Sequence, residues 1–479
     1  MSYSKKPEET LDPENWDEMI TLGKRMAEDM VTWQKNLRNE PVLISNAPEI
    51  LDYFKQPAPR EPLGAEKTYQ EFLEKILKHH GSWLQSPKNL AMVLGSSTPF
   101  AALSDMWMAG LNGIPGPPKM HISPHVELQV ITWFKEVLGY PKEASGILGS
   151  GGSMANLIGL TVGRNAKAGY NVKEEGIREK FTFYGSTEMH SSIPRALEQM
   201  GIGSKYLVRI PVDSEYRINV SQLKTRVAQD RATGYRPLCV IGNAGSTNTG
   251  SFDDFNALAD YCADEDLWFH VDGAYGAWAA LSPKYKHLTN GMVRADSLTF
   301  DLHKWMFMPY GIGCTLVKDG DAHYFTYSTH ADYIAHEDRW LVDYGVELSR
   351  PFRALKAWMS IKENGFDKYG RIIEKNIEQA QYLAELVKAS PSLELLAPVP
   401  MNVVNFRYVK DGLDERKLND LNQRIVESIN ASGGYFIYTS KVGEKVSIRV
   451  CVTNHRTTRG DLKGLVDEVH KVSRSLSNS

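Results

Sequence analysis

The sequence has few cysteines, little net charge and no long apolar run, and each shortage removes a class of protein. Its 479 residues include four cysteines. None stands in a C-x-x-C pair, so neither a zinc ribbon nor a disulfide scaffold is indicated. The 55 lysines and arginines nearly balance the 58 aspartates and glutamates, for a formal net charge of −3. Nucleic-acid-binding domains are usually strongly basic, so we expect no nucleic-acid partner. No run of about 18 apolar residues occurs, so we expect no membrane partner or membrane span.

The composition is that of a large globular protein. Hydrophobic residues make up 42% and charged residues 24%, which excludes a disordered chain. The N-terminal segment, MSYSKKPEETLDPENWDEM, is polar and acidic and lacks the apolar stretch of a secretory signal peptide. Reduced thiols are the simplest interpretation of the cysteines, and a cytoplasmic location follows as an expectation.

The first 85 residues predict a helical arm. Residues 14–40 carry apolar side chains near helical spacing, and a second helix is expected from about Tyr69 to His79. These helices offer too little compact core to stand alone, so we expect the arm to pack on the main body or on a second subunit. An independent helical hairpin is the alternative.

Residues 86–355 alternate short apolar runs with helical stretches, which predicts an α/β body with a mostly parallel sheet. The expected strands are Ser145–Leu148, Phe181–Tyr184, Tyr206–Pro211, Leu238–Gly242, Leu267–Val271, Ser297–Phe300 and Gly313–Val317. Residues 356–479 predict a smaller domain of helices followed by a βαβ-like tail. In that tail, strands Met401–Tyr408 and Val446–Val452 flank a helix near Glu415–Ser432.

Polar residues follow four of the predicted strands. Ser150-Gly151-Gly152-Ser153 opens a helix and is either an anion-binding loop or a plain tight turn. His190 also stands where a helix begins, and it lies either over a ligand or in an ordinary capping position. Because parallel strands end at one edge of a sheet, ligands of such sheets bind there.

Two further residues at this edge carry charge. Asp272 ends an apolar strand, where a buried carboxylate needs a cation or several donors; capping of the next helix is the alternative. Lys304 lies among aromatic and apolar residues and is a candidate amine nucleophile, or else a surface lysine. An anion cradle, a flat side chain, a carboxylate and an amine together suit a phosphorylated pyridine aldehyde, pyridoxal 5'-phosphate.

The motifs that carry these residues resemble those of the pyridoxal-phosphate-dependent group II decarboxylases, which act on aromatic amino acids, glutamate, aspartate or cysteine sulfinate. The matching segments are HVDGAYG (270–276), DSLTFDLHKW (296–305), GSGGSMAN (149–156) and EMHSS (188–192). The resemblance extends from the arm to about Glu363 and more loosely beyond. It implies fold type I, the aminotransferase-like fold. It also implies a homodimer with its active sites at the interface and an arm that wraps the partner.

The resemblance also implies residue roles. Lys304 is expected to bind the cofactor covalently, Asp272 to pair with the pyridinium nitrogen, and His190 to stack on the ring. Ala274 is expected to pack on the opposite face of that ring.

Further roles concern the phosphate and the ring oxygen. Gly152 and Ser153 are expected to bind phosphate with help from His303. Thr247, in GNAGSTNTG (242–250), is expected near the cofactor's phenolic oxygen or the stacked histidine.

A loop after the lysine strand carries the expected proton donor. Tyr333 matches the family tyrosine that protonates the carbon left by carbon dioxide, and Tyr324 and Tyr327 are competitors. Because relatives with phenylalanine there release aldehydes, a tyrosine favours simple decarboxylation. A tyrosine packed in an ordinary loop is the alternative.

The substrate expected is a small L-amino acid, aromatic first and acidic second. The segment Leu94–Pro99 has fewer aromatic residues than the substrate loop of the animal aromatic-amino-acid enzymes. Candidate arginines for an acidic side chain are Arg353, Arg449 and Arg456. Rival functions are aldehyde synthase, transaminase, carbon–carbon lyase and a non-catalytic homologue. A zinc hydrolase is a weaker rival, because His79, His80, His121 and His125 lack H-E-x-x-H spacing and no metal is expected.

Overall fold

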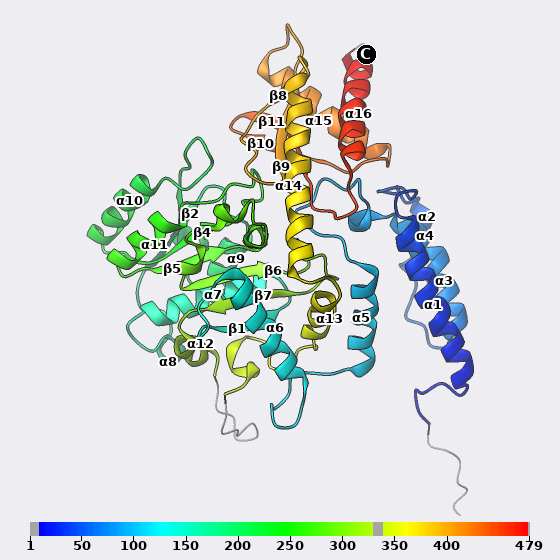
Figure 1. Cartoon of the computed structure of the whole chain (residues 1–479), viewed down its shortest axis with the longest axis horizontal. Coiled ribbons are helices and arrows are strands. Elements are labelled where there is room, and N and C mark those ends of the chain that lie inside the picture. The colour runs from blue at the N-terminus through cyan, green and yellow to red at the C-terminus, as the bar shows by residue number, and fades with distance from the viewer. Residues whose placement is uncertain (1–8, 329–338, 478–479) are drawn as a thin grey trace, which may run out of the picture.

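Two β-sheets organise the chain (Figure 1). The computed structural model describes residues 9–328 and 339–477. The larger sheet has strands β1 (Ser145–Gly149), β2 (Phe181–Ser186), β3 (Leu207–Ile210), β4 (Arg236–Asn243), β5 (Trp268–Asp272), β6 (Ser297–Asp301) and β7 (Gly313–Val317). The smaller sheet has β8 (Leu393–Leu395), β9 (Val403–Tyr408), β10 (Tyr438–Val442) and β11 (Lys445–Cys451).

The larger sheet is mostly parallel, as the alternating pattern predicts. Its strand order is β1-β7-β6-β5-β4-β2-β3. The strands from β6 to β3 in this order all pair in parallel, whereas β7 pairs antiparallel with both β6 and β1. The carboxyl ends of β1, β2, β4, β5 and β6 therefore lie at one edge of the sheet, and the segments that follow these strands meet there.

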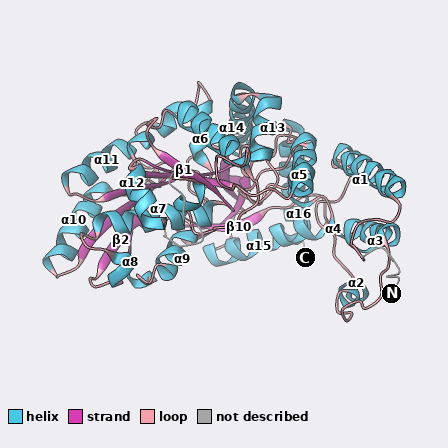
Figure 2. Cartoon of the chain, turned by 90° about the horizontal axis from the view of Figure 1, so that it is seen from below, coloured by secondary structure: helices cyan, strands magenta, loops and turns pink. Residues whose placement is uncertain are grey.

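Helices cover both faces of this sheet (Figure 2). The body helices are α5 (Pro99–Leu111), α6 (Ser123–Leu138), α7 (Gly152–Lys167), α8 (Val172–Glu175), α9 (Ser192–Gln199), α10 (Val220–Ala232), α11 (Phe255–Asp264), α12 (Gly320–Tyr327) and α13 (Ala354–Asn364). Along β4, Val240 packs in one core with α6 and α11, whereas Cys239 and Ile241 pack in another with α7 and α9. Burial on both faces explains why these strands are continuous apolar runs.

The C-terminal part corrects one prediction. Its sheet has the order β10-β11-β9-β8 and pairs antiparallel throughout, so the tail is not a βαβ unit. The cause is β10, a strand that the sequence pattern did not indicate, which forms a hairpin with β11 and reverses the chain before β11 meets β9. Helices α14 (Phe366–Ala389), α15 (Glu415–Ala431) and α16 (Arg459–Ser477) complete this part.

The N-terminal arm lies along one side of the body (Figure 1). Its helices are α1 (Trp16–Asn36), α2 (Pro48–Tyr53), α3 (Ala65–Glu71), a π-helical turn (Phe72–Leu77) and α4 (Lys78–His80). Asn15 caps α1 by accepting from the backbone N–H groups of Asp17 and Glu18. Arg38, just beyond α1, binds Asp461 of α16 at 2.7 Å, so the arm contacts the body of its own chain.

Within the described ranges, every helix is too short or too polar to cross a bilayer.

The division of the chain into an arm, a large domain and a small domain at residues 85 and 355 stays a prediction.

Candidate active site

A pocket of about 330 Å³ lies at the carboxyl edge of the larger sheet. It is lined by Leu94, Ser150, Gly151, Gly152, Ser153, Met154, Asn156, His190, Ser192, Asp272, Ala274, Asp301, His303, Lys304 and Tyr310. We refer to it as the cofactor pocket. The segments that follow β1, β2, β5 and β6 therefore meet in one place, as the topology requires.

Most of the residues predicted for the site line this pocket, with two exceptions. Thr247 is not among the lining residues; its carbonyl oxygen accepts a 2.7 Å hydrogen bond from Arg449 Nη1. Tyr333 lies outside the described residues. The roles of both stay predictions.

Gly151 and Gly152 form a cradle that only glycine allows. Gly151 has φ +146°, and a Cβ added there would lie 2.8 Å from Cε1 of His303. A Cβ on Gly152 would lie 2.9 Å from Oδ2 of Asp301 and 3.2 Å from Cβ of Ala274. The cradle begins α7, a helix of 16 residues, whose N-terminal N–H groups and dipole favour a phosphate.

Asp272 is 8% exposed and held by two donors. Its Oδ2 accepts from Asn156 Nδ2 at 3.0 Å and its Oδ1 accepts from the Ala274 backbone N–H at 3.1 Å. Neither donor carries a charge, so a cation in the pocket could still pair with this carboxyl group.

Asn156 connects Asp272 to a buried histidine behind the pocket. The Asn156 side-chain oxygen accepts from His270 Nε2 at 2.9 Å and from Thr299 Oγ1 at 2.7 Å. On the other side of the ring, His270 Nδ1 lies 2.8 Å from Ser297 Oγ. The N–H₂ group of Asn156 donates to Asp272, so the side-chain oxygen of Asn156 faces His270 and must accept from it. The proton of His270 is therefore assigned to Nε2.

Burial lowers the pKa of His270 from 6.5 to about 4, so this network is built for a neutral imidazole. As pH falls from about 6.5 towards 4, the unfolded chain binds a proton at this position and the folded chain does not. We expect the free energy of unfolding to fall by up to about 3 kcal/mol over this range from His270 alone. A His270→Gln variant should lose this contribution, so its urea unfolding should depend less on pH.

The exposed His287 offers a matched control, because His287→Gln should leave the pH dependence of unfolding unchanged. Equal pH dependence in wild type and His270→Gln would contradict the prediction.

His190 lies over the pocket from the start of α9. Its Nδ1 is 2.9 Å from Ser192 Oγ and accepts from the Ser192 backbone N–H at 3.2 Å. Nδ1 is therefore an acceptor, the ring proton sits on Nε2, and the flat ring is held from one side.

Lys304 enters the pocket beside an acid. Its Nζ lies 3.2 Å from Oδ2 of Asp301, and its side chain is 16% exposed. The other oxygen of Asp301, Oδ1, is buried without a hydrogen-bond partner among the described residues. His303 Nδ1 lies 2.8 Å from the carbonyl oxygen of Ile312, and burial lowers the His303 pKa.

The sequence reasoning gave no role to several lining residues, among them Asn156, Asp301 and Tyr310. Asn156 stands three residues after Ser153, on the same helix face, so helical spacing was an available signal. Asp301 stands within a motif already singled out. Tyr310 stacks on His303 with 4.3 Å between ring centroids, and no local pattern marks it, because a turn separates it from Lys304.

None of the three candidate arginines lines the cofactor pocket. Arg353 binds Glu347 at 3.1 Å. Arg449 donates to the carbonyl oxygens of Thr247 and Ala91. Arg456 donates to the carbonyl oxygen of Ser97 at 3.1 Å.

The donor set fits pyridoxal phosphate. A glycine cradle at a helix N-terminus can take the phosphate, Asp272 can hold a protonated ring nitrogen, and Lys304 supplies an amine. Among the described residues, no three His, Cys, Asp or Glu side chains converge on a metal site. Fold and site together define a pyridoxal-phosphate enzyme of fold type I.

Comparison with known proteins assigns the chain more closely. It belongs to the pyridoxal-dependent decarboxylase family, whose conserved domain matches residues 56–409. An aromatic-L-amino-acid decarboxylase of Bacillus atrophaeus is 34% identical over 97% of both chains. A tryptophan decarboxylase of Oryza sativa is 27% identical over 97% of both chains.

The solved structure of tryptophan decarboxylase from Catharanthus roseus, in complex with L-tryptophan, superposes with a TM-score of 0.87. It is 22% identical, and the match covers 97% of this chain and all of that one. The chain is thus an amino acid decarboxylase that uses pyridoxal phosphate.

Proposed function

We propose that the protein decarboxylates an aromatic L-amino acid of the tyrosine, Dopa or tryptophan class to the amine and carbon dioxide. The observation that carries the proposal is the meeting of Lys304, Asp272 and His190 in one pocket. The aromatic class is supported by relatives named for aromatic substrates and by the absence of the three candidate arginines from the lining.

When bound, pyridoxal phosphate supplies an aldehyde that condenses with amines and a ring that accepts the electron pair left by departing carbon dioxide. In our proposal Lys304 holds the cofactor and yields its place to the substrate amine. Asp272 keeps the proton on the ring nitrogen, and His190 lies against the ring. The N–H groups at Gly152 and Ser153 hold the phosphate, with His303 beside them, while Ala274 packs on the other face.

A panel of L-amino acids tests the substrate class. The cofactor-loaded protein is incubated with each amino acid, and products are identified by mass spectrometry, with Lys304→Ala as control. Amines from tyrosine, Dopa or tryptophan are expected. Amines from glutamate, aspartate or cysteine sulfinate would overturn the aromatic assignment and keep the reaction. Aldehyde or keto acid as the main product would overturn the assigned outcome of the reaction.

We also propose, from the family resemblance, that Tyr333 donates the proton that completes the amine. A Tyr333→Phe variant should then raise the ratio of aldehyde to amine, because the carbon left by carbon dioxide waits longer for its proton and oxygen competes. The ratio is measured by chromatography of the products under air. Tyr324→Phe and Tyr327→Phe serve as matched controls, and an unchanged ratio in Tyr333→Phe would contradict the role.

We further propose a homodimer with its active sites at the interface. Support comes from apolar side chains exposed on α5, where Trp107 is 60% and Met106 53% exposed. The segment from Leu94, which lines the cofactor pocket, runs directly into this helix. An α5 face that packs on a second subunit would therefore place that subunit close to the pocket.

A Trp107→Glu variant should split the dimer and lower activity together, because it places a charge in an apolar interface. Light scattering gives the mass of the particle. Phe325→Glu is the matched control, since Phe325 is 49% exposed on α12, away from α5 in Figure 1. A dimer that survives Trp107→Glu unchanged would contradict this placement of the interface.

We propose a cytoplasmic location as well. Its support is the four cysteines, which are all buried and unpaired, as is usual in a reducing compartment.

A further inference from the structure

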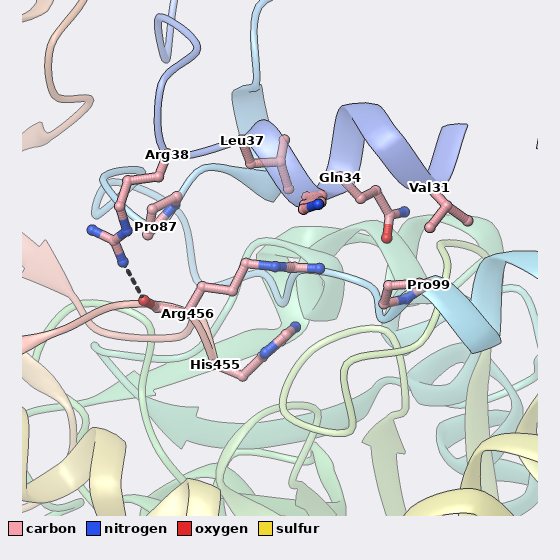
Figure 3. Close-up of a pocket in the computed structure, with 9 residues that line it drawn as sticks. Val31, Gln34, Leu37, Arg38, Pro87, Pro99, His455 and Arg456 are labelled. Atoms are coloured by element: carbon pink, nitrogen blue, oxygen red, sulfur yellow. Dashed lines mark hydrogen bonds between the residues drawn. The ribbon is translucent and has the colours of Figure 1, made fainter. Parts of the chain in front are cut away.

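A second cavity, of about 550 Å³, lies where the arm meets the body (Figure 3). One wall is the C-terminal end of α1. The other walls are the loop between Pro87 and Pro99 and the segment that joins β11 to α16. No described residue lines both this cavity and the cofactor pocket, so the two are separate sites. We refer to it as the arm cavity.

Arg456 is a charged group at the arm cavity that lacks a counter-charge. Its guanidinium donates to the Ser97 carbonyl oxygen at 3.1 Å and to Gln85 Oε1 at 3.5 Å, both neutral. Burial alone lowers its pKa to about 10, and among the described residues it forms no ion pair. By contrast, the buried Arg350 and Arg407 each bind a glutamate, at 2.7 and 2.6 Å. Arg456 is half-buried, and a charge that is partly withdrawn from water without a counter-charge is costly.

Gln34 is a second polar group without a partner. It is 5% exposed, and its side-chain oxygen is buried with no hydrogen bond to a described residue. Figure 3 shows its amide turned from α1 towards Arg456 and Pro99. Because the amide can rotate about its terminal bond, it can present its N–H₂ group to an anion.

The rest of the lining selects the ligand. Lys35 and Arg38 add positive charge, although Arg38 already binds Asp461 at 2.7 Å. No aspartate or glutamate belongs to the described lining. The remaining lining consists of His455 and the apolar residues Val31, Leu37, Pro87 and Pro99. Such a site suits one anionic group attached to an apolar body.

We propose that the arm cavity binds a small organic acid, with its carboxylate on Arg456 and Gln34 and its apolar body against the α1 wall. A guanidinium binds a carboxylate through two parallel hydrogen bonds, which supplies both charge and direction. No covalent step is involved, and the bound acid takes no part in the decarboxylation reaction.

The arm cavity is also connected to the catalytic segment. Arg456 holds Ser97, and two residues earlier the Gly95 N–H donates to the His303 carbonyl oxygen at 3.3 Å. His455 packs edge-on against Phe307, with 5.3 Å between ring centroids. An acid bound on Arg456 would therefore contact a residue that hydrogen-bonds the segment packed against His303 and Lys304. A ligand at this position could act as an effector.

Calorimetric titration of the holoenzyme with phenylacetate tests the proposal. Two reference ligands separate the contributions: 2-phenylethanol has the same body without the carboxylate, and inorganic phosphate has charge without the body. We expect one phenylacetate per chain and at least tenfold weaker binding of both reference ligands. Equally tight binding of phosphate or of 2-phenylethanol would overturn the assigned ligand class.

Four variants locate the ligand. Arg456→Gln removes the charge, and Val31→Trp fills the cavity from α1 without touching a hydrogen bond. Each should weaken binding at least tenfold. Arg424→Gln, at a surface arginine bound to Asp420, should leave binding unchanged, and Lys304→Ala should still bind phenylacetate.

Absence of binding, or binding unaffected by both Arg456→Gln and Val31→Trp, would overturn the proposal. Loss of binding in Lys304→Ala together with unchanged binding in Arg456→Gln would overturn it too, because that pair of results would place the acid in the cofactor pocket. Should Arg456→Gln fail to fold, as judged by its thermal unfolding, Val31→Trp decides. A protein that binds phenylacetate yet decarboxylates no amino acid would refute the proposed function and leave this inference standing.

Discussion

A Lys304→Ala variant should lose activity by roughly 10³-fold or more in kcat/KM, because it removes the only amine among the described residues that line the cofactor pocket. Lys304 Nζ lies 3.2 Å from Asp301, within the described lining, which contains no second lysine. Steady-state assay of amine release measures the loss. Lys318→Ala is the matched control, since Lys318 is exposed just after β7.

The same variant separates covalent attachment from mere binding. Borohydride reduction of the loaded wild-type protein, followed by peptide mass spectrometry, should place the cofactor on the peptide that contains Lys304. The variant should carry no such adduct. An adduct on another lysine, or Lys304→Ala activity within tenfold of wild type, would contradict the assigned role.

An Asp272→Asn variant should lose about 10²- to 10³-fold in kcat, because it removes one preorganised charge from the site. Asparagine keeps the size of the side chain and can still accept from the Ala274 N–H, which bonds Asp272 at 3.1 Å. The change therefore keeps the shape of the side chain and removes its charge, together with the hydrogen bond that Oδ2 accepts from Asn156. In our proposal the lost function is protonation of the ring nitrogen, without which the ring accepts electrons poorly.

A modified cofactor sharpens this test. Pyridoxal phosphate methylated at the ring nitrogen carries a permanent positive charge and needs no acid to maintain it. It should restore a part of the activity of Asp272→Asn and none of the activity of Lys304→Ala. Asp296→Asn is the matched control, because Asp296 is a half-buried carboxylate that caps β5 by accepting from the Phe269 N–H at 2.8 Å. Equal rates for Asp272→Asn and wild type would contradict the role.

Much of the fold was readable from local patterns. Strands such as β5 and β6 are buried on both faces, so they stand out as short apolar runs between helical stretches. The direction of β7 was not readable, because an apolar strand looks alike in either orientation. The short strand β10 escaped because its residues are polar and half-exposed, and missing it produced the wrong βαβ tail.

The site shows the same division. Asp272 ends a strand of the larger sheet, and Gly152, His190 and Lys304 each follow one, so sequence position alone assigned them to one edge. Asn156, which donates to Asp272, lies on a helix, and His270, which donates to Asn156, lies inside a strand. Helical spacing could place Asn156 near Ser153, but nothing in the sequence indicated the partner of either residue.

By itself, therefore, the sequence determined the α/β class, the cofactor and a set of candidate residues at one edge of the sheet, because strand ends and glycine turns are local features. Only the tertiary structure decided which hydrogen-bond or ion-pair partners each charged side chain has. Asp272 received uncharged donors, Lys304 received Asp301, and Arg456 was left facing a cavity against α1, 422 positions away from Gln34 along the chain (456 − 34 = 422). Such pairings depend on contacts between segments far apart in the chain, and burial then sets whether a charge is neutralised, shared or left for a ligand.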